Sequence, residues 1–217
     1  MSGIDAVVFD LDGVIVDSEQ VWDEVRERFV RESGGTYTEA ATRAMMGMSS
    51  PEWSAYLVDD LGVPMTPEEA NAEVVRRMLE RYGEAPPLIP GAVDAVRRIG
   101  ARWPLAIASS ANRELIDVVV AAAGLGDLIR VSVSSEEVGR GKPAPDVYLE
   151  AARRLGVEAA RCAAVEDSHN GIRSARAAGM RVVAVPNLHF PPDDEALAQA
   201  DVVLGSIAEL TPDVVER

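Results

Sequence analysis

Six short runs of apolar and β-branched residues recur along the chain and predict buried strands. They cover residues 4–9, 105–108, 129–133, 162–165, 182–185 and 202–204. Helical patterns lie between some of these runs, at 112–123, 145–155 and 170–178, and each pattern ends near a glycine, as many helices do. Strands that alternate with helices indicate a parallel sheet covered on both faces, so we predict an α/β fold with a Rossmann-like core.

The alternation stops between about residue 18 and residue 85. The stretches EQVWDEVRERFVRESGG and TPEEANAEVVRRMLERYG indicate amphipathic helices closed by glycine. Thr66 as N-cap, Pro67 at the first helical position and Glu69 in a capping box mark the start of the second helix. We predict a helical cap at 18–85, with the core formed by 1–17 and 86–217 and PPLIPG as a stiff return linker. The alternative is a few extra packing helices.

Composition narrows the class of protein. The 217 residues allow one sizeable domain, or one domain with a smaller insert. Acidic residues outnumber basic ones by 36 to 21, which disfavours nucleic acids and anionic membranes as partners. The start, MSGIDAVVFD, lacks the features of a signal peptide, and Cys162 is the only cysteine. We therefore expect a cytoplasmic protein without disulfides, as a monomer or weak dimer.

The first predicted strand ends in two acids, within the stretch AVVFDLDGVIVDSE. Side chains alternate along a strand, so Asp10 and Asp12 point to one side, and Gly13 allows a sharp turn directly after them. Two like charges this close are unfavourable unless something neutralises them, and a divalent cation that prefers oxygen ligands is the simplest candidate. The alternative is a solvated loop with two unrelated acids.

Further polar side chains follow three other predicted strands: Ser109, Ser110 and Asn112; Lys142; and Glu166 with Asp167. Ligands of open α/β sheets bind beyond the carboxyl ends of the strands, so we expect all of these side chains to converge on the two aspartates. Ser109 and Ser110 compete for one role, and we favour Ser109 because it ends the apolar run. Asn112 is a candidate for binding substrate, or alternatively only an N-cap.

This set of groups suits phosphoryl transfer. Four carboxylates need positive charge, which Mg²⁺ and Lys142 supply, and the same charges hold phosphoryl oxygens while Ser109 and main-chain N–H groups donate hydrogen bonds. One carboxylate can attack phosphorus and form an aspartyl-phosphate. A second carboxylic acid can protonate the leaving alcohol and then activate water to hydrolyse the intermediate.

Four stretches resemble the signature motifs of the haloacid dehalogenase-like hydrolases: FDLDGVIVDSE, AIASSAN, GKPAPDVYLEAARRLG and AVEDSHNGIRSARAAGM. The resemblance implies a Rossmann-like core with a helical cap inserted after the first strand. It also implies a nucleophile at Asp10 and a general acid/base at Asp12, with Ser109 and Lys142 holding the phosphoryl group. The implied Mg²⁺ ligands are Asp10, the carbonyl of Asp12, and Asp167, with Glu166 adjacent or acting through water.

The family contains several activities, and the resemblance narrows them. Its dehalogenases lack an acid two places after the nucleophile, so Asp12 favours phosphoryl transfer. Its β-phosphoglucomutases carry a histidine where Trp22 stands and an arginine where Ser50 stands. The stretches DSEQVWDE and PLIPG instead resemble bacterial sugar and sugar-alcohol phosphatases.

We therefore predict a Mg²⁺-dependent phosphatase of a small phosphorylated metabolite, a sugar or polyol phosphate. The alternatives are a β-phosphoglucomutase-like phosphomutase and, more remotely, a non-catalytic binding protein on the same fold. Loss of an essential acid or of Lys142 would mark such a binding protein, and the chain keeps all of them. Met45, Met46 and Met48 near the expected cap loop are either core residues or an adaptable wall that faces the substrate.

Overall fold

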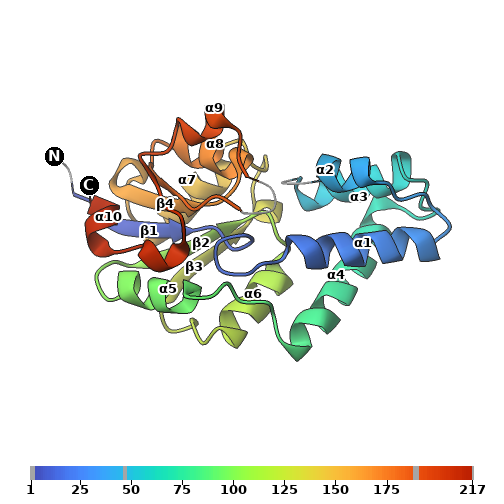
Figure 1. Cartoon of the computed structure of the whole chain (residues 1–217), viewed down its shortest axis with the longest axis horizontal. Coiled ribbons are helices and arrows are strands. Elements are labelled where there is room, and N and C mark those ends of the chain that lie inside the picture. Colours follow the sequence, from blue (N-terminus) through green and yellow to red (C-terminus); the bar gives the residue numbers. More distant parts are fainter. Residues whose placement is uncertain (1–2, 46–47, 188–190, 217) are drawn as a thin grey trace.

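A computed structural model describes residues 3–45, 48–187 and 191–216 of the chain. Its centre is a parallel sheet in the order β3-β2-β1-β4-β5-β6, which confirms the predicted α/β class (Figure 1). The strands are β1 (Ala6–Phe9), β2 (Leu105–Ser109), β3 (Ile129–Ser134), β4 (Cys162–Glu166), β5 (Arg181–Ala184) and β6 (Val202–Val203). Each lies within about two residues of a predicted apolar run.

Ten α-helices are described: α1 (Glu19–Glu32), α2 (Glu39–Met45), α3 (Ser50–Asp59), α4 (Pro67–Glu84), α5 (Ala92–Gly100), α6 (Arg113–Ala122), α7 (Asp146–Leu155), α8 (His169–Ala177), α9 (Asp194–Leu197) and α10 (Pro212–Glu216). The predicted helices at 112–123, 145–155 and 170–178 correspond to α6, α7 and α8. Among the described residues, no helix combines the length and the apolar character needed to cross a membrane.

The sheet is buried on both faces because its strands alternate between two apolar clusters. Val7 and Phe9 of β1 belong to the cluster that includes α5 and α6, whereas Ala6 and Val8 belong to the cluster that includes α7 and α8. Figure 1 shows these two helix pairs on opposite sides of the sheet. Because helices cover both faces, nearly every residue of these strands is apolar, as is usual for parallel strands.

The register of the sheet positions the functional edge. β1 is central and pairs in parallel with β2 on one side and β4 on the other, with Phe9 opposite Ile107 and Val165. β1 ends at this level, while β4 continues to Glu166 and β2 continues to Ser109, so the three strands end close to one another. Asp10, at the end of β1, thus lies beside the ends of β2 and β4, as expected for groups at the carboxyl ends of parallel strands.

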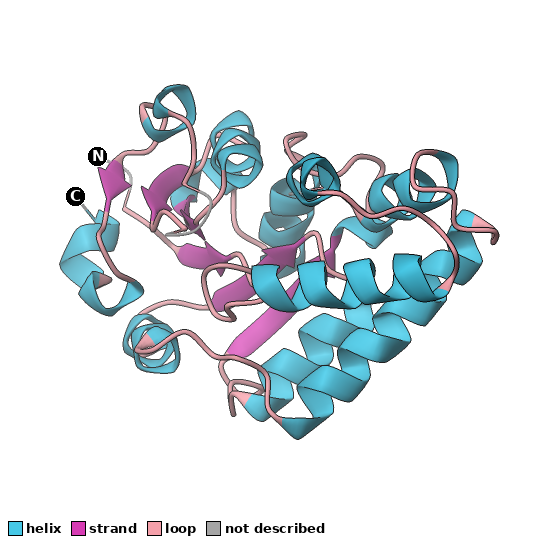
Figure 2. Ribbon diagram, turned by 45° about the vertical axis from the view of Figure 1, so that its right-hand side comes forward, coloured by secondary structure: helices cyan, strands magenta, loops and turns pink. Residues whose placement is uncertain are grey.

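Helices α1–α4 lie together to one side of the sheet, between β1 and α5 in the chain (Figures 1 and 2). No strand forms in the described part of this segment. Its helices bury large side chains such as Trp53, Phe29 and Met78. The predicted capping box also forms: Thr66 accepts a hydrogen bond from the N–H of Glu69, whose side chain accepts one from the N–H of Thr66.

Candidate active site

Asp10 and Lys142 form a buried ion pair at the carboxyl end of β1. Lys142 Nζ lies 2.9 Å from Asp10 Oδ1, and the side chain of Lys142 is only 3% exposed. Burial and the neighbouring charge of Glu166 raise the pKa of Asp10, even though Lys142 opposes the shift. Burial lowers the pKa of Lys142, but the charges of Asp10 and Glu166 outweigh it and keep the ammonium protonated.

Glu166 holds Lys142 in this position from the other side. Its Oε1 accepts hydrogen bonds of 2.6 Å from both Lys142 Nζ and the Tyr148 hydroxyl. Its Oε2 accepts a bond of 3.1 Å from the N–H of Asp167. Tyr148, on α7, is fully buried and was not identified from the sequence, although it lies within the third motif. Glu166 therefore orients the ammonium toward Asp10.

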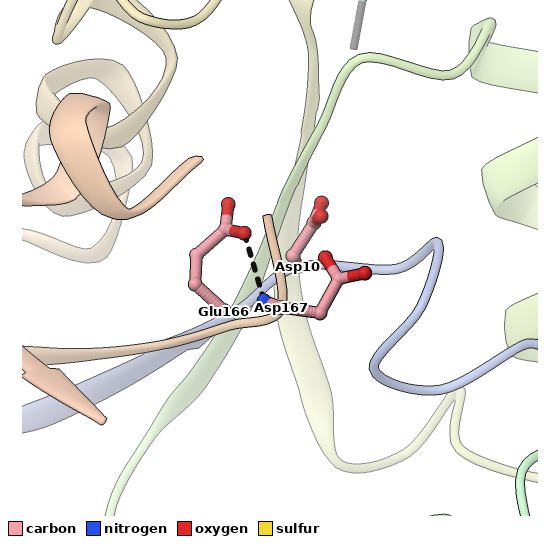
Figure 3. A group of neighbouring side chains, drawn as sticks. All are labelled: Asp10, Glu166 and Asp167. Carbon is pink, nitrogen blue, oxygen red and sulfur yellow. Dashed lines mark hydrogen bonds between the residues drawn. The ribbon is translucent and has the colours of Figure 1, made fainter. Parts of the chain in front are cut away.

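Three carboxylates gather at this edge and fit a cation. Oxygens of Asp10, Glu166 and Asp167 lie within 4.8 Å of one another, and all three residues are buried (Figure 3). Burial, then the charges of Glu166 and Asp10, raise the pKa of Asp167 well above its ordinary value. Lys142 is the only cation among the described residues that pairs with this cluster. A divalent cation with oxygen ligands would offset the remaining negative charge.

Two glycines allow the acids to lie this close to the backbone. Gly13 has φ +75°, and a Cβ atom there would lie 1.8 Å from Asp167 Oδ2. Gly171, in the first turn of α8, would place a Cβ 1.9 Å from Glu166 Oε1. Neither position has room for a larger residue while the carboxylates stay in place.

Asp12 lies apart from the acidic cluster and contacts the start of α1. Its Oδ1 accepts hydrogen bonds from the Ser18 hydroxyl and, at 3.4 Å, from Trp22 Nε1. Ser18 stands at the N-cap position of α1, but its side chain makes no capping bond. The two aspartates of the first motif therefore have different surroundings: Asp10 faces Lys142, and Asp12 faces α1.

The residues predicted after β2 divide between the core and the pocket. Ser109 is fully buried; its hydroxyl accepts a bond of 3.0 Å from the N–H of Ala111 and donates one of 3.4 Å to Asp12. Ser110 lines the pocket. Asn112 is at the N-cap position of α6 without a side-chain capping bond. Its amide instead contacts Ser50 of α3 at 3.1 Å and Asn71 of α4 at 3.2 Å, and so connects the start of α6 to the helices of the inserted segment.

A pocket lies above these groups, between the strand ends and α1–α3. The strand ends contribute acids, Lys142 and Ser110. The segment from α1 to α3 contributes apolar and charged side chains, namely Glu19, Trp22, Arg26, Met45, Met48 and Trp53. Met45 and Met48 therefore belong to the predicted wall, while Met46 lies outside the described residues. Glu19 and Arg26 were not identified from the sequence. The signal was their spacing with Trp22, which places all three on one face of α1.

Comparison with known proteins agrees with this geometry. The haloacid dehalogenase-like hydrolase family matches residues 4–179. A probable pseudouridine-5'-phosphatase of Drosophila melanogaster is 32% identical over 219 residues, covering 95% of this chain and 91% of that protein. Hexitol phosphatase B of Escherichia coli K12 is 31% identical over 216 residues, covering 95% of this chain and 94% of that protein.

Among solved structures, a mutant of CbbY from Rhodobacter sphaeroides in complex with xylulose 1,5-bisphosphate superposes with a TM-score of 0.89. It is 25% identical, and the match covers 99% of this chain and 100% of that one. The predicted fold and family are thus confirmed. The chain belongs to the haloacid dehalogenase-like hydrolases.

Proposed function

We propose that the chain is a Mg²⁺-dependent phosphatase that hydrolyses a sugar or polyol phosphate through an aspartyl-phosphate. One arrangement carries the proposal: Asp10 is buried against Lys142 inside the acidic cluster, while Asp12 lies outside it and faces the cap. A nucleophile and an acid/base need these two environments, since one carboxylate must stay near the cation and the other must exchange a proton with the leaving group.

Similar proteins support the reaction and the substrate class. The relatives' names confirm the predicted enzyme class, a phosphoric monoester hydrolase. They name a pseudouridine phosphate and a hexitol phosphate as substrates, and both are small phosphorylated compounds with hydroxyl groups. The pocket suits such a leaving group because its cap side carries indole and thioether side chains beside charged ones.

Each side chain has a distinct role in this mechanism. Asp10 attacks phosphorus, and Lys142 holds the phosphoryl oxygens beside it. Asp12 protonates the leaving oxygen and then takes a proton from the attacking water. Ser109 and Ser110 are the candidates for hydrogen bonds to the phosphoryl group, and Ser109 also positions Asp12.

The acidic cluster would hold Mg²⁺. Its ligands would be Asp10, Asp167 and the main-chain carbonyl of Asp12, with Glu166 contributing directly or through water. When bound, Mg²⁺ supplies positive charge that offsets the charge of the phosphoryl oxygens. Glu166 has a second role, since both of its oxygens already accept protein hydrogen bonds.

Residues 18–85 would act as the cap that covers the pocket and excludes bulk water, with 1–17 and 86–217 as the catalytic core. The connection through Asn112, Ser50 and Asn71 supports a cap that closes onto the core. We place the protein in the cytoplasm, as a monomer or weak dimer that binds neither nucleic acid nor membrane.

The phosphomutase alternative is weakened at two cap positions. Trp22 donates a hydrogen bond to Asp12 where the mutases carry histidine, and Ser50 bonds to Asn112 where they carry arginine. Because Arg26 supplies a cation from elsewhere in the cap, the alternative is tested directly.

The experiment measures free phosphate released from sugar phosphates, polyol phosphates and nucleotides, with Mg²⁺ or with EDTA. We expect Mg²⁺-dependent release from a few sugar or polyol phosphates, abolished in Asp10→Asn and retained in Asp127→Asn, which alters an exposed acid far from the pocket. A second arm supplies β-glucose 1-phosphate with glucose 1,6-bisphosphate. Glucose 6-phosphate formed with little free phosphate would establish phosphomutase activity. No activity on any compound would favour a non-catalytic binding protein.

A further inference from the structure

Arg26 places a guanidinium group between two indole rings in the cap. Its Cζ lies 4.5 Å from the ring centroid of Trp22 and 4.9 Å from that of Trp53. The two rings are 6.0 Å apart and inclined at 56°, so they enclose the group on two sides. Aromatic faces attract a guanidinium and restrict its orientation. The two rings therefore hold the side chain in place, while the charges of Glu19, Asp12 and Asp23 act on it only from a distance.

The guanidinium is buried but forms no ion pair with a described carboxylate. Arg26 is 9% exposed, and its Nε has no hydrogen-bond partner. Within residues 3–45, 48–187 and 191–216, no carboxylate forms an ion pair with it, although Glu19 lies on the same face of α1. Burying an unpaired charge is unfavourable, and arginine stays protonated at physiological pH. The guanidinium of Arg26 therefore has room for an anionic partner that the described residues do not supply.

Arg77, on α4, is an arginine of the same helical segment whose charge is paired with carboxylates. It also lies over an aromatic ring, with Cζ 5.3 Å from the centroid of Phe29. It differs in forming ion pairs of 2.7 Å with both Glu32 and Glu73. Arg26 has the aromatic contact without the carboxylates, and unlike Arg77 it lines the pocket that contains Asp10 and Lys142.

We propose that Arg26 binds an anionic group, a carboxylate or a second phosphate, at the end of the substrate opposite the transferring phosphate. This inference rests on the proposed function, because it places the transferring phosphate at Asp10. Lys142 and the acidic cluster occupy the core side of the pocket, and Arg26 lies on its cap side. A substrate anion would supply the missing partner and can accept two parallel hydrogen bonds from a guanidinium. The substrate class thus narrows to phosphorylated compounds with a second negative charge.

The test measures dissociation constants by calorimetry with Mg²⁺, in the Asp10→Asn background so that turnover cannot interfere. The compounds are sorbitol 6-phosphate, which has a neutral distal end, 6-phosphogluconate, with a carboxylate, and fructose 1,6-bisphosphate, with a second phosphate. We expect at least one of the two anionic compounds to bind about 10- to 100-fold more tightly than the polyol phosphate, the range for hydrogen bonds to a charged group. The arm that gains affinity identifies the anion.

Added to this background, Arg26→Met should remove the preference and leave the affinity for sorbitol 6-phosphate within about 3-fold. Arg26→Lys should keep part of the preference because it retains the charge. Arg77→Met is the matched control and should keep all of it. Thermal unfolding confirms that each variant is folded.

Two kinds of result would overturn the inference. The first is a lack of tighter binding by both anionic compounds, including no binding of either. The second is an equal loss of affinity for all three compounds in Arg26→Met with normal behaviour in Arg26→Lys, which would make Arg26 a packing element between the two tryptophans. Neither result bears on phosphate release by the unmodified enzyme, so failure of this inference and failure of the proposed function are distinguishable.

Discussion

Glu19 offers a quantitative test of the electrostatics on the cap side of the pocket. Burial, and then the charge of Asp12, raise the pKa of Glu19 from 4.5 to about 7, although Arg26 opposes the shift. A carboxyl group with a raised pKa in the folded state makes folding less favourable once it ionises. Replacing Glu19 with glutamine keeps the size and polarity of the side chain and removes the charge.

The sign of the effect follows from proton binding. Between about pH 4.5 and 7, folded Glu19 holds a proton that the unfolded chain has released, so its contribution to the free energy of unfolding falls as pH rises. At about 1.4 kcal/mol per pH unit, this interval corresponds to an upper limit of about 3 kcal/mol. Glu19→Gln should match the unmodified protein near pH 4 and gain up to that amount near pH 8.

The assay is urea unfolding at several pH values in EDTA, which keeps cation binding out of the comparison. Glu24→Gln, on the exposed side of the same helix, is the control and should stay within about 0.5 kcal/mol throughout, since its ion pair with Arg81 is long and exposed. Equal stability of Glu19→Gln and unmodified protein near pH 8 would refute the reasoning. A less stable Glu19→Gln would show that ionised Glu19 is a favourable partner of Arg26.

Three further substitutions test the core and the cap contact. Tyr148→Phe removes the 2.6 Å hydrogen bond to Glu166 and should lower the free energy of unfolding by about 1.5–3 kcal/mol, measured in urea; an unchanged value would contradict the network. Gly13→Ala would force a methyl group to within 1.8 Å of Asp167, so Mg²⁺ binding measured by calorimetry should be lost, and normal affinity would contradict this. Asn112→Ala should destabilise the protein by about 1–3 kcal/mol and speed hydrogen exchange in α3 and α4; unchanged exchange would exclude a role in holding the cap.

The part of the site at the strand ends was predictable from the sequence because the pairing of parallel strands determines where the residues after each strand lie. Once β1 pairs with β2 and β4, the residues after each strand must meet at one edge, whatever the loops between them do. Asp10, Glu166 and Asp167 follow from this rule, whereas Lys142 lies in the long loop after β3 (Ile129–Ser134), where the rule gives the edge of the sheet but not the contact with Asp10. The choice between Ser109 and Ser110 does not, because it depends on side-chain direction at the strand end rather than on the register.

For the part of the site formed by α1–α3, the sequence predicted the helices but not which of their side chains line the pocket. Their pattern fixes which residues share a face of α1, but not which face meets the core. The spacing of Arg26 places it on the same face of α1 as Trp22, unlike the solvated Arg28 and Arg31, but the sequence does not show what this face contacts. Only the packing of α1 against α3 shows that Trp22 and Trp53 enclose it.

Substitutions in the two parts of the site should have different structural effects. The core acids are constrained twice, by strand register and by close contacts such as Gly13 against Asp167, so a substitution there disturbs the cation site and the backbone together. Glu19, Trp22 and Arg26 line the pocket from α1, and Phe29 of the same helix is buried in the apolar core. Phe29 therefore gives α1 an anchor in the apolar core that does not involve Arg26. In the proposed function, phosphoryl transfer depends on Asp10 and Lys142 of the core, and the choice of leaving group depends on side chains of α1–α3. Substitutions in these two groups should have nearly additive effects on the free energy of transition-state binding, whereas Asp12, which contacts Trp22, should couple them.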